Sequence, residues 1–251
     1  MEIRLFINKS VHENAAYYYE EAKKLRKKAE GLEKAIEETK KELDKIQKKK
    51  KETPQIRTKR EQKWYEKFHW FYTSGNKLVF GGKDAQQNDL VVSRHMEDND
   101  LFFHADIQGA SAIILKDGKT ASEQELLETA QFAASFSSAW KNGNSAVDVY
   151  AVGKGQLSKA APGGFIPTGA FAIDGKRIWF KSTPIKLLLL KEEDTAIILP
   201  AIASQKPGII LLPSKSGKEK GAIAKQLAKQ LSVHPDIFLQ ILPSGKTKIQ
   251  K

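Results

Sequence analysis

The chain has 251 residues, with 42 Lys and Arg side chains against 30 Asp and Glu, so its formal net charge is +12. Its 40% hydrophobic content includes 12 Phe, 4 Trp and 6 Tyr, enough for at least one buried core, which excludes global disorder. The lack of cysteine excludes disulfides, thiolate zinc sites and thiol nucleophiles. Without an apolar run near ~20 residues or a signal-peptide pattern, we expect a soluble cytoplasmic protein with no membrane partner.

The positive charge is concentrated at the two ends of the chain. Residues 1–70 carry a net charge of +7, residues 71–190 a net charge of zero, and residues 191–251 a net charge of +5. A basic protein favours a polyanionic partner, because neutralised phosphates release counterions. We therefore expect bulk electrostatic affinity from the ends and selective recognition from the neutral middle.

The first 60 residues are predicted to form a long helical arm. A short strand is expected over Ile3–Ile7, and Ser10 with Glu13 has the spacing of a capping box that begins a helix of ~40 residues. Apolar or small residues then recur at alternating steps of three and four, the pattern of a coiled-coil seam. The seam comprises Ala15, Tyr18, Ala22, Leu25, Ala29, Leu32, Ile36, Thr39, Leu43 and Ile46.

A coiled coil needs a second strand, and after Pro54 only residues 56–68 are available for a return. We therefore expect another chain to supply it, either a separate protein or a second copy. The alternative is a single solvated helix supported by Glu–Lys pairs. Lysines at the end of the arm are candidate phosphate contacts or a solvated face: Lys48, Lys49 and Lys50.

Residues 61–190 mix helical and strand-like segments without regular alternation, which favours an α+β fold with a mixed sheet and packed helices. Helices are expected over residues 84–96 and from Ser122, capped with Glu125, to about Trp140. Six aromatic side chains between Trp64 and Tyr72 are expected to pack mostly in the core. Strands are expected over 78–80, 101–105, 112–115, 147–152, 170–173 and 177–180.

Residues 191–251 are expected to form a small basic α/β region. A strand over residues 209–212 leads into the loop PSKSGKEKG and a helix over residues 222–231. The loop lacks the spacing of a nucleotide-binding P-loop. It fits either a generic anion site before a helix, with Lys215 and Lys218 as contacts, or a plain surface turn.

Three polar segments of the neutral domain are candidate binding loops. In GGKDAQQN, Asp84 is expected to cap a helix, and the segment offers a polar surface with Lys83, Gln87 and Asn88. In LFFHADIQGAS, a structural hydrogen bond from His104 to Asp106 is favoured over catalysis or metal binding, and Gln108 follows. The long loop GKGQLSKAAPGGFIPTGAF contributes donor side chains: Gln156, Ser158 and Lys159.

The blocks WYEKFHWFYTSGNKLVFGGKDAQQNDLVV, LFFHADIQGAS, the helix ending in SSAW, and QLSKAAPGGFIPTGAF closely resemble the RNA-binding module of the NFACT family. The preceding SVHENAAYYYEEAKKLRKKAEGLEKA resembles the coiled-coil arm that leads into this module, so the resemblance covers about residues 1–190. The resemblance does not extend to the N-terminal NFACT domain of the family. Lys83 stands where arginine is usual.

The resemblance implies an RNA-binding factor of ribosome-associated quality control. Such a factor docks on large ribosomal subunits that carry stalled peptidyl-tRNA, and it contacts tRNA and rRNA. A coiled-coil scaffold that pairs with a separate NFACT half or with itself is the alternative. Catalysis, a metal and a cofactor are not expected, because no nucleophile, metal-ligand set or nucleotide fingerprint accompanies His104, Asp106 and Asp84.

Overall fold

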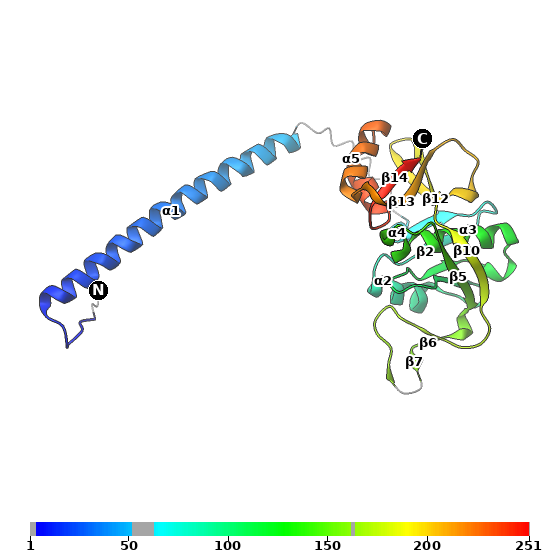
Figure 1. The fold of residues 1–251 in the computed structure, drawn as a ribbon, viewed down its shortest axis with the longest axis horizontal. Coiled ribbons are helices and arrows are strands. Elements are labelled where there is room, and N and C mark those ends of the chain that lie inside the picture. The colour runs from blue at the N-terminus through cyan, green and yellow to red at the C-terminus, as the bar shows by residue number, and fades with distance from the viewer. Residues whose placement is uncertain (1–3, 52–62, 162–163, 251) are drawn as a thin grey trace. The chain divides into compact units, whose positions relative to one another are not determined.

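A computed structural model describes residues 4–51, 63–161 and 164–250, with the backbone alone for 44–51, 161 and 165. The chain divides into two compact units, residues 1–61 and residues 62–251 (Figure 1). No helix in these ranges combines the length and the apolarity needed to cross a bilayer.

The first unit is built on one long helix, α1, which spans Val11–Lys51. Its start is the predicted capping box, because Glu13 accepts hydrogen bonds from the backbone and hydroxyl of Ser10 at 2.7 and 2.8 Å. The side chain of Asn14 holds the preceding turn through the backbone of Phe6, Lys9 and Ser10. Residues 4–7 form no strand, so the predicted strand was wrong over its described part, because this segment instead wraps around Asn14.

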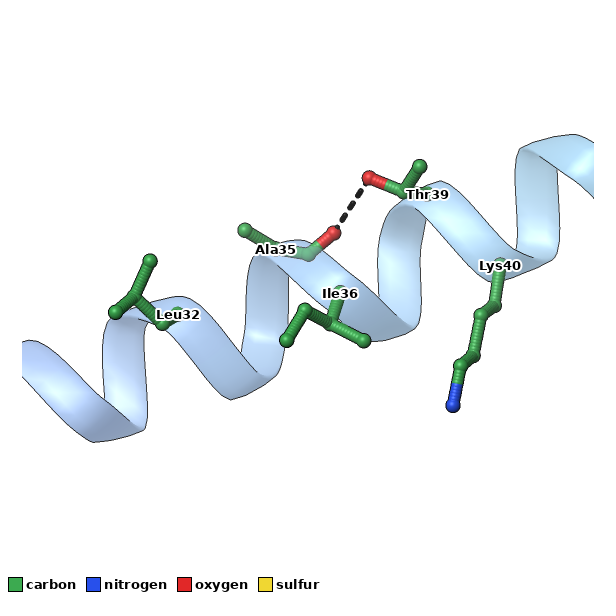
Figure 2. Close-up of a pocket in the computed structure, with 5 residues that line it drawn as sticks. All are labelled: Leu32, Ala35, Ile36, Thr39 and Lys40. Atoms are coloured by element: carbon green, nitrogen blue, oxygen red, sulfur yellow. Dashed lines mark hydrogen bonds between the residues drawn. The ribbon is translucent and has the colours of Figure 1, made fainter.

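The apolar seam of α1 is exposed within residues 1–61 over its described side chains, from Ala15 to Leu43. Figure 2 shows one stretch of it, where Leu32 and Ile36 lie one turn apart and Thr39 donates a 2.7 Å hydrogen bond to the Ala35 carbonyl. Leu25 and Leu43 are also more than half exposed. The helix is confirmed, and its pairing into a coiled coil stays a prediction.

The second unit contains an antiparallel six-stranded sheet, consistent with the expected α+β class. Alternation along its strands sends side chains to two opposite faces. In β3, for example, Leu101 and Phe103 join one core, and Phe102 joins the other. The spatial order is β1 (His69–Tyr72), β2 (Leu78–Gly81), β4 (Ile113–Leu115), β3 (Leu101–Ala105), β5 (Ala146–Gly153) and β10 (Ile178–Pro184).

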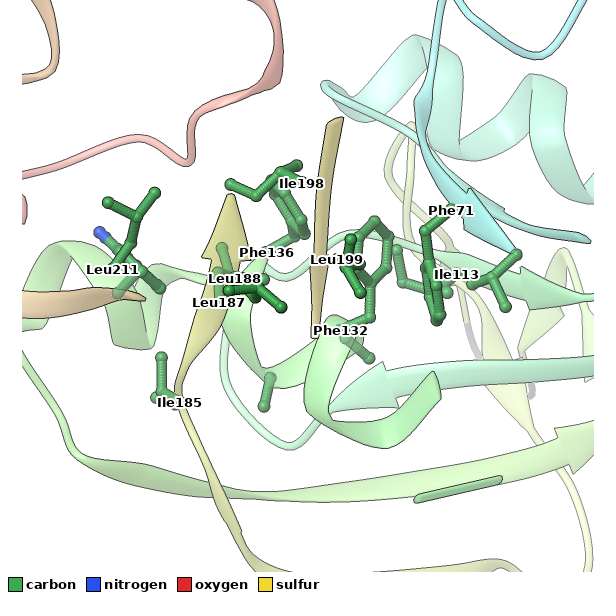
Figure 3. Close-up of a cluster of buried hydrophobic side chains, with 14 of the residues drawn as sticks. Phe71, Ile113, Phe132, Phe136, Ile185, Leu187, Leu188, Ile198, Leu199 and Leu211 are labelled. Atoms are coloured by element: carbon green, nitrogen blue, oxygen red, sulfur yellow. The ribbon is translucent and has the colours of Figure 1, made fainter. Parts of the chain in front are cut away.

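A second sheet, with four antiparallel strands, comes after the six-stranded sheet in the sequence. Ile185 lies in the short connection between β10 and the first strand of this second sheet. Its order is β12 (Thr195–Pro200), β11 (Leu187–Glu192), β13 (Ile209–Lys218) and β14 (Thr247–Gln250). Helix α3 (Glu123–Ser135) packs between this part and the larger sheet, and Figure 3 shows its Phe132 beside side chains of both sheets. The boundary expected at 190/191 falls inside β11, and one hydrophobic core includes residues from both sides of it.

The second core covers the opposite face of the six-stranded sheet. Phe68, Phe80 and Phe102 are buried there, and α2 (Ala85–Leu90) and the π-helical turn Val91–His95 pack over them. Phe68 and two other aromatics of the Trp64–Tyr72 run are buried, as expected. Trp64, however, remains about half exposed and stacks on the His95 ring with a centroid distance of 4.5 Å.

Several predicted elements have different bounds in the structure. The helix expected to reach Trp140 breaks at Phe136, because the Ser137 hydroxyl caps a second helix, α4 (Ser138–Asn142). The predicted loop after residue 212 is instead extended strand, since β13 continues to Lys218 beside β14. Helix α5 spans Lys220–Leu231, and α6 (Pro235–Ile241) follows it.

Candidate nucleic-acid interface

A cavity of about 540 Å³ opens on the second-core face of the six-stranded sheet. Its walls come from the turn between β2 and α2, the loop between β3 and β4, and the segment just before β9 (Ala172–Ile173). Five of the predicted site residues line it: Lys83, Asp84, Asn88, His104 and Gln108.

The start of α2 forms one wall and is fixed by its own polar residues. Asp84 caps the helix, as predicted, by accepting a 2.8 Å hydrogen bond from the Gln87 backbone, and Gln87 accepts from the Lys83 backbone at 3.1 Å. Asn88 is buried, where it accepts from the Ala112 backbone at 3.0 Å. The side chains of Gln87 and Asn88 therefore hold the wall, whereas the Lys83 ammonium forms no hydrogen bond or ion pair within the described residues.

The floor of the cavity is aromatic. Phe102 and His104 project from β3 to the same face, and His104 pairs in register with Tyr150 of β5. The Nδ1 atom of His104 lies 3.3 Å from the Tyr150 hydroxyl, while the side chain of Asp106 is exposed beyond the end of the strand. The expected His104–Asp106 hydrogen bond was therefore wrong, because β3 ends at Ala105.

Burial lowers the pKa of His104. Hydrogen bonds with the backbone of Ala105 and Ala110 and the negative charge of Asp106 act in the opposite direction. The pKa of Tyr150 is raised, chiefly by burial. At neutral pH, both side chains are therefore uncharged groups that donate or accept hydrogen bonds.

The long loop after β5 closes the cavity and is tied to α2. Lys159 forms an ion pair with Asp89, donates to the Ala170 carbonyl at 2.6 Å, and lies 4.1 Å from the Phe171 ring centroid. Asp89 also accepts a 3.0 Å hydrogen bond from the backbone of Gly169. Gly169 has φ of +80°, and an added Cβ would lie 2.7 Å from the Ala85 Cα, so only glycine fits there.

The three predicted residues of this loop do not line the cavity. Gln156 bridges the Gly153 amide and the carbonyls of Asp174 and Lys176. Ser158 closes a local turn with Ala160. Together with the Lys159 contacts, these bonds indicate that the three side chains shape the loop.

The prediction missed a row of side chains at the edge of the six-stranded sheet, in which a tryptophan lies between two cations. Arg177, Trp179 and Lys181 project to one side at edge strand β10, with the Arg177 Cζ 4.7 Å from the Tyr150 ring centroid. The Lys181 Nζ lies 4.0 Å from the Trp179 centroid and 2.7 Å from an Asp148 oxygen. The signal was present as RIWFK, in which every second residue is basic or aromatic.

Two further predicted contacts, Lys215 and Lys218, do not line the cavity. Lys215 and Lys218 belong to β13, and the Lys218 Nζ donates to Gln226 at 2.7 Å. The side chains of Lys48, Lys49 and Lys50 lie outside the described residues. Within the described ranges, no three His, Asp or Glu side chains gather as a metal-ligand set.

Residues 67–175 match the family described as NFACT protein RNA binding domain. The chain is also 40% identical over 203 residues to the Archaeal Rqc2 homolog aRqcH of Methanocaldococcus jannaschii, covering 77% of this chain and 30% of that protein. The chain belongs to the NFACT family. All residues that line the cavity lie within the matched NFACT RNA-binding domain.

Two animal proteins are also similar to the chain. The Ribosome quality control complex subunit NEMF homolog of Drosophila melanogaster is 37% identical over 194 residues, which are 73% of this chain and 20% of that protein. The Ribosome quality control complex subunit NEMF of Homo sapiens is 35% identical over 171 residues, 65% of this chain and 16% of that protein. The chain thus spans less than a third of the length of each of these relatives.

Proposed function

We propose that this NFACT chain is an RNA-binding factor of ribosome-associated quality control in the cytoplasm. It contacts tRNA or rRNA on large ribosomal subunits that carry stalled peptidyl-tRNA, and it acts by binding rather than by catalysis. The observation that carries the proposal is the RNA-binding domain match over a cavity flanked by Lys83 and by the Arg177–Trp179–Lys181 edge. The names of its relatives support the setting of ribosome quality control.

Trp179 provides the most direct test of RNA binding. Its side chain is 39% exposed beside two cations, an arrangement that suits stacking of an unpaired base. We expect Trp179→Ala to weaken binding of single-stranded RNA or tRNA by about 1–3 kcal/mol, roughly 5- to 150-fold. Fluorescence anisotropy with labelled RNA measures the change, and Trp179→Phe, which keeps a ring, should retain most of the affinity.

The salt dependence of the same titration tests the phosphate contacts. Raising the salt from about 50 to 200 mM should lower the affinity, with a log–log slope near −0.7 to −0.9 for each phosphate contacted. An affinity that does not change with salt, or that survives Trp179→Ala unaltered, would contradict the proposal.

The exposed seam of α1 favours pairing of the arm with a second helix as a further role. Leu32 and Ile36 are each more than half exposed within residues 1–61, and a coiled-coil partner would bury them. We expect Leu32→Lys with Ile36→Lys to abolish self-association, or association with a separate NFACT half, in analytical ultracentrifugation. Glu37→Lys, a charge change on the same helix outside the seam, is the control. A wild-type chain that stays monomeric and binds no such half would rule this role out.

A further inference from the structure

We propose that the cavity holds the base of a single unpaired nucleotide, with the adjoining phosphate at Lys83. This inference rests on the proposed RNA-binding function and names what the cavity recognises. A volume of about 540 Å³ lies in the range of about 300–1,000 Å³ that is usual for small-molecule sites. A base turned out of a helix or loop can enter such a space, whereas a paired duplex cannot.

The aromatic lining favours a flat, uncharged group. Phe102 contacts the Phe171 ring edge-on with a centroid distance of 5.8 Å and lies parallel to the His104 ring at 6.0 Å. Tyr150 completes this set, at 5.8 Å from His104. Aromatic rings that present their faces and edges to the cavity can contact any of the four nucleobases.

The polar side chains that are still free lie around this aromatic floor. Lys83, Gln108, Ser111 and Thr168 line the cavity, and their side chains form no hydrogen bond or ion pair within the described part of the chain. Asp84 places a carboxylate on the same wall, which repels phosphate and accepts hydrogen bonds from amino groups. The base edge therefore enters the cavity, and the phosphate stays at its cationic rim.

The neighbouring nucleotide has a place beside the cavity. Tyr150 lines the cavity, and its ring centroid lies 5.5 Å from that of Trp179 on the edge strand. Arg177 stands over both rings, at 4.7 Å from Tyr150 and 5.8 Å from Trp179. An RNA strand that places one base in the cavity can thus stack the next base on Trp179.

Contacts within the protein hold the walls of the cavity in place. The Lys159–Asp89 ion pair joins the closing loop to α2, and the Gly169 amide adds a second bond to the same carboxylate. A preformed cavity loses little conformational entropy on binding, which raises affinity and selectivity.

A cavity-filling substitution tests the proposal. Ala170 is exposed at the rim and lines the cavity, so Ala170→Leu narrows the cavity, and no side-chain hydrogen bond is lost because the alanine side chain forms none. The probes are a fluorescein-labelled RNA hairpin with one bulged nucleotide and the same hairpin fully paired. We expect the wild type to prefer the bulged hairpin by about 5- to 150-fold and Ala170→Leu to lose that preference while it keeps duplex affinity.

The matched control is Ala160→Leu, an exposed alanine of the same loop outside the cavity, which should keep the preference. Equal thermal melting of both variants and the wild type establishes that Ala170→Leu is folded. Gln108→Ala, which trims a free amide at the exposed lip, should cause a smaller loss of preference. An Ala170→Leu variant with an unchanged preference would overturn the proposal.

Other outcomes separate this inference from the proposed function. Salt-dependent RNA binding with no preference for the bulge would overturn the inference and leave the function standing. Failure to bind either hairpin or tRNA would overturn the function itself. Competition with each free ribonucleoside monophosphate distinguishes the two sources of a nucleotide: displacement by a monophosphate, without any preference for bulged RNA, would contradict an RNA base as the occupant.

Discussion

Replacing Trp140 with alanine is expected to destabilise residues 62–251 by about 3–5 kcal/mol. The Trp140 side chain is 0% exposed and belongs to the core shared by both sheets. Its Nε1 donates a 3.2 Å hydrogen bond to the Thr247 hydroxyl, so the substitution both opens a cavity and leaves a buried hydroxyl with one partner fewer. Urea unfolding followed by tryptophan fluorescence measures this loss, because all four Trp residues lie in this unit.

Trp179→Ala is the matched control, since the same side chain is removed from an exposed edge strand. It should change the free energy of unfolding by less than about 1 kcal/mol while it weakens RNA binding. Thr247→Val isolates the hydrogen bond and should cost about 1 kcal/mol. Equal destabilisation by the two Trp substitutions would contradict this assignment of the core.

Replacing Asp100 with alanine is the second substitution with a large expected effect, a destabilisation of about 3 kcal/mol. The fully buried carboxylate accepts hydrogen bonds from the Glu97 backbone at 2.7 Å, from the Lys116 ammonium at 2.8 Å, and from the Asp117 backbone at 2.9 Å. Its removal leaves these two backbone donors without their acceptor, and among the described residues Lys116 then pairs with the Glu97 carboxylate alone. Urea unfolding of Asp100→Ala and Asp100→Asn measures the loss.

Asp100→Asn should be destabilising too, because one carboxylate oxygen becomes an NH2 group that faces at least one group that is itself a donor. Glu97→Gln is the control: its carboxylate also pairs with Lys116, at 3.0 Å, but its side chain is 77% exposed, so a change within about 1 kcal/mol is expected. If Glu97→Gln cost as much as Asp100→Ala, the buried carboxylate would not be the centre of this network.

The carboxylates of this network also shift the pKa of Lys116. Burial alone lowers that pKa, but hydrogen bonds to Asp100 and Glu97 outweigh burial and raise it above its ordinary 10.5. The stabilising contribution of Lys116 is therefore fully present below pH 10.5 and is lost as the pH rises through the raised value.

Local chemistry made much of the fold predictable from the sequence. Both capping boxes start their helices where the spacing placed them, at Ser10 and at Ser122. Strand β3 has the predicted bounds, because five consecutive apolar or half-buried residues are flanked by polar ones. Helix α1 could be predicted from its apolar periodicity and its cap alone.

Elements that depend on distant partners were not predictable in the same way. The segment PSKSGK has the composition of a loop, yet it belongs to β13, because its two ends, Pro213 and Lys218, both pair with the distant Thr247 of β14, with an irregular register between them. Strands β12 and β14 were missed for the same reason, since an edge strand is defined by the sheet it joins.

The candidate site was predicted in part. Two of the three polar segments meet at the cavity through Lys83, Asp84, Asn88, His104 and Gln108, and the third closes it with residues 167–171. The roles of individual residues depended on register and packing. His104 faces Tyr150 because β3 and β5 are paired, and no local pattern in either strand specifies that pairing.

The Trp140–Thr247 hydrogen bond joins residues 107 positions apart, which has a consequence for folding during synthesis. At about 5–20 residues per second, roughly 5–20 s pass between the translation of the tryptophan codon and that of its threonine partner. Trp140 lacks its acceptor throughout that interval, and β13 lacks its neighbour β14 from the time β13 is made until the interval ends. The shared core can therefore close only late in synthesis, and the nascent domain exposes apolar surface until then.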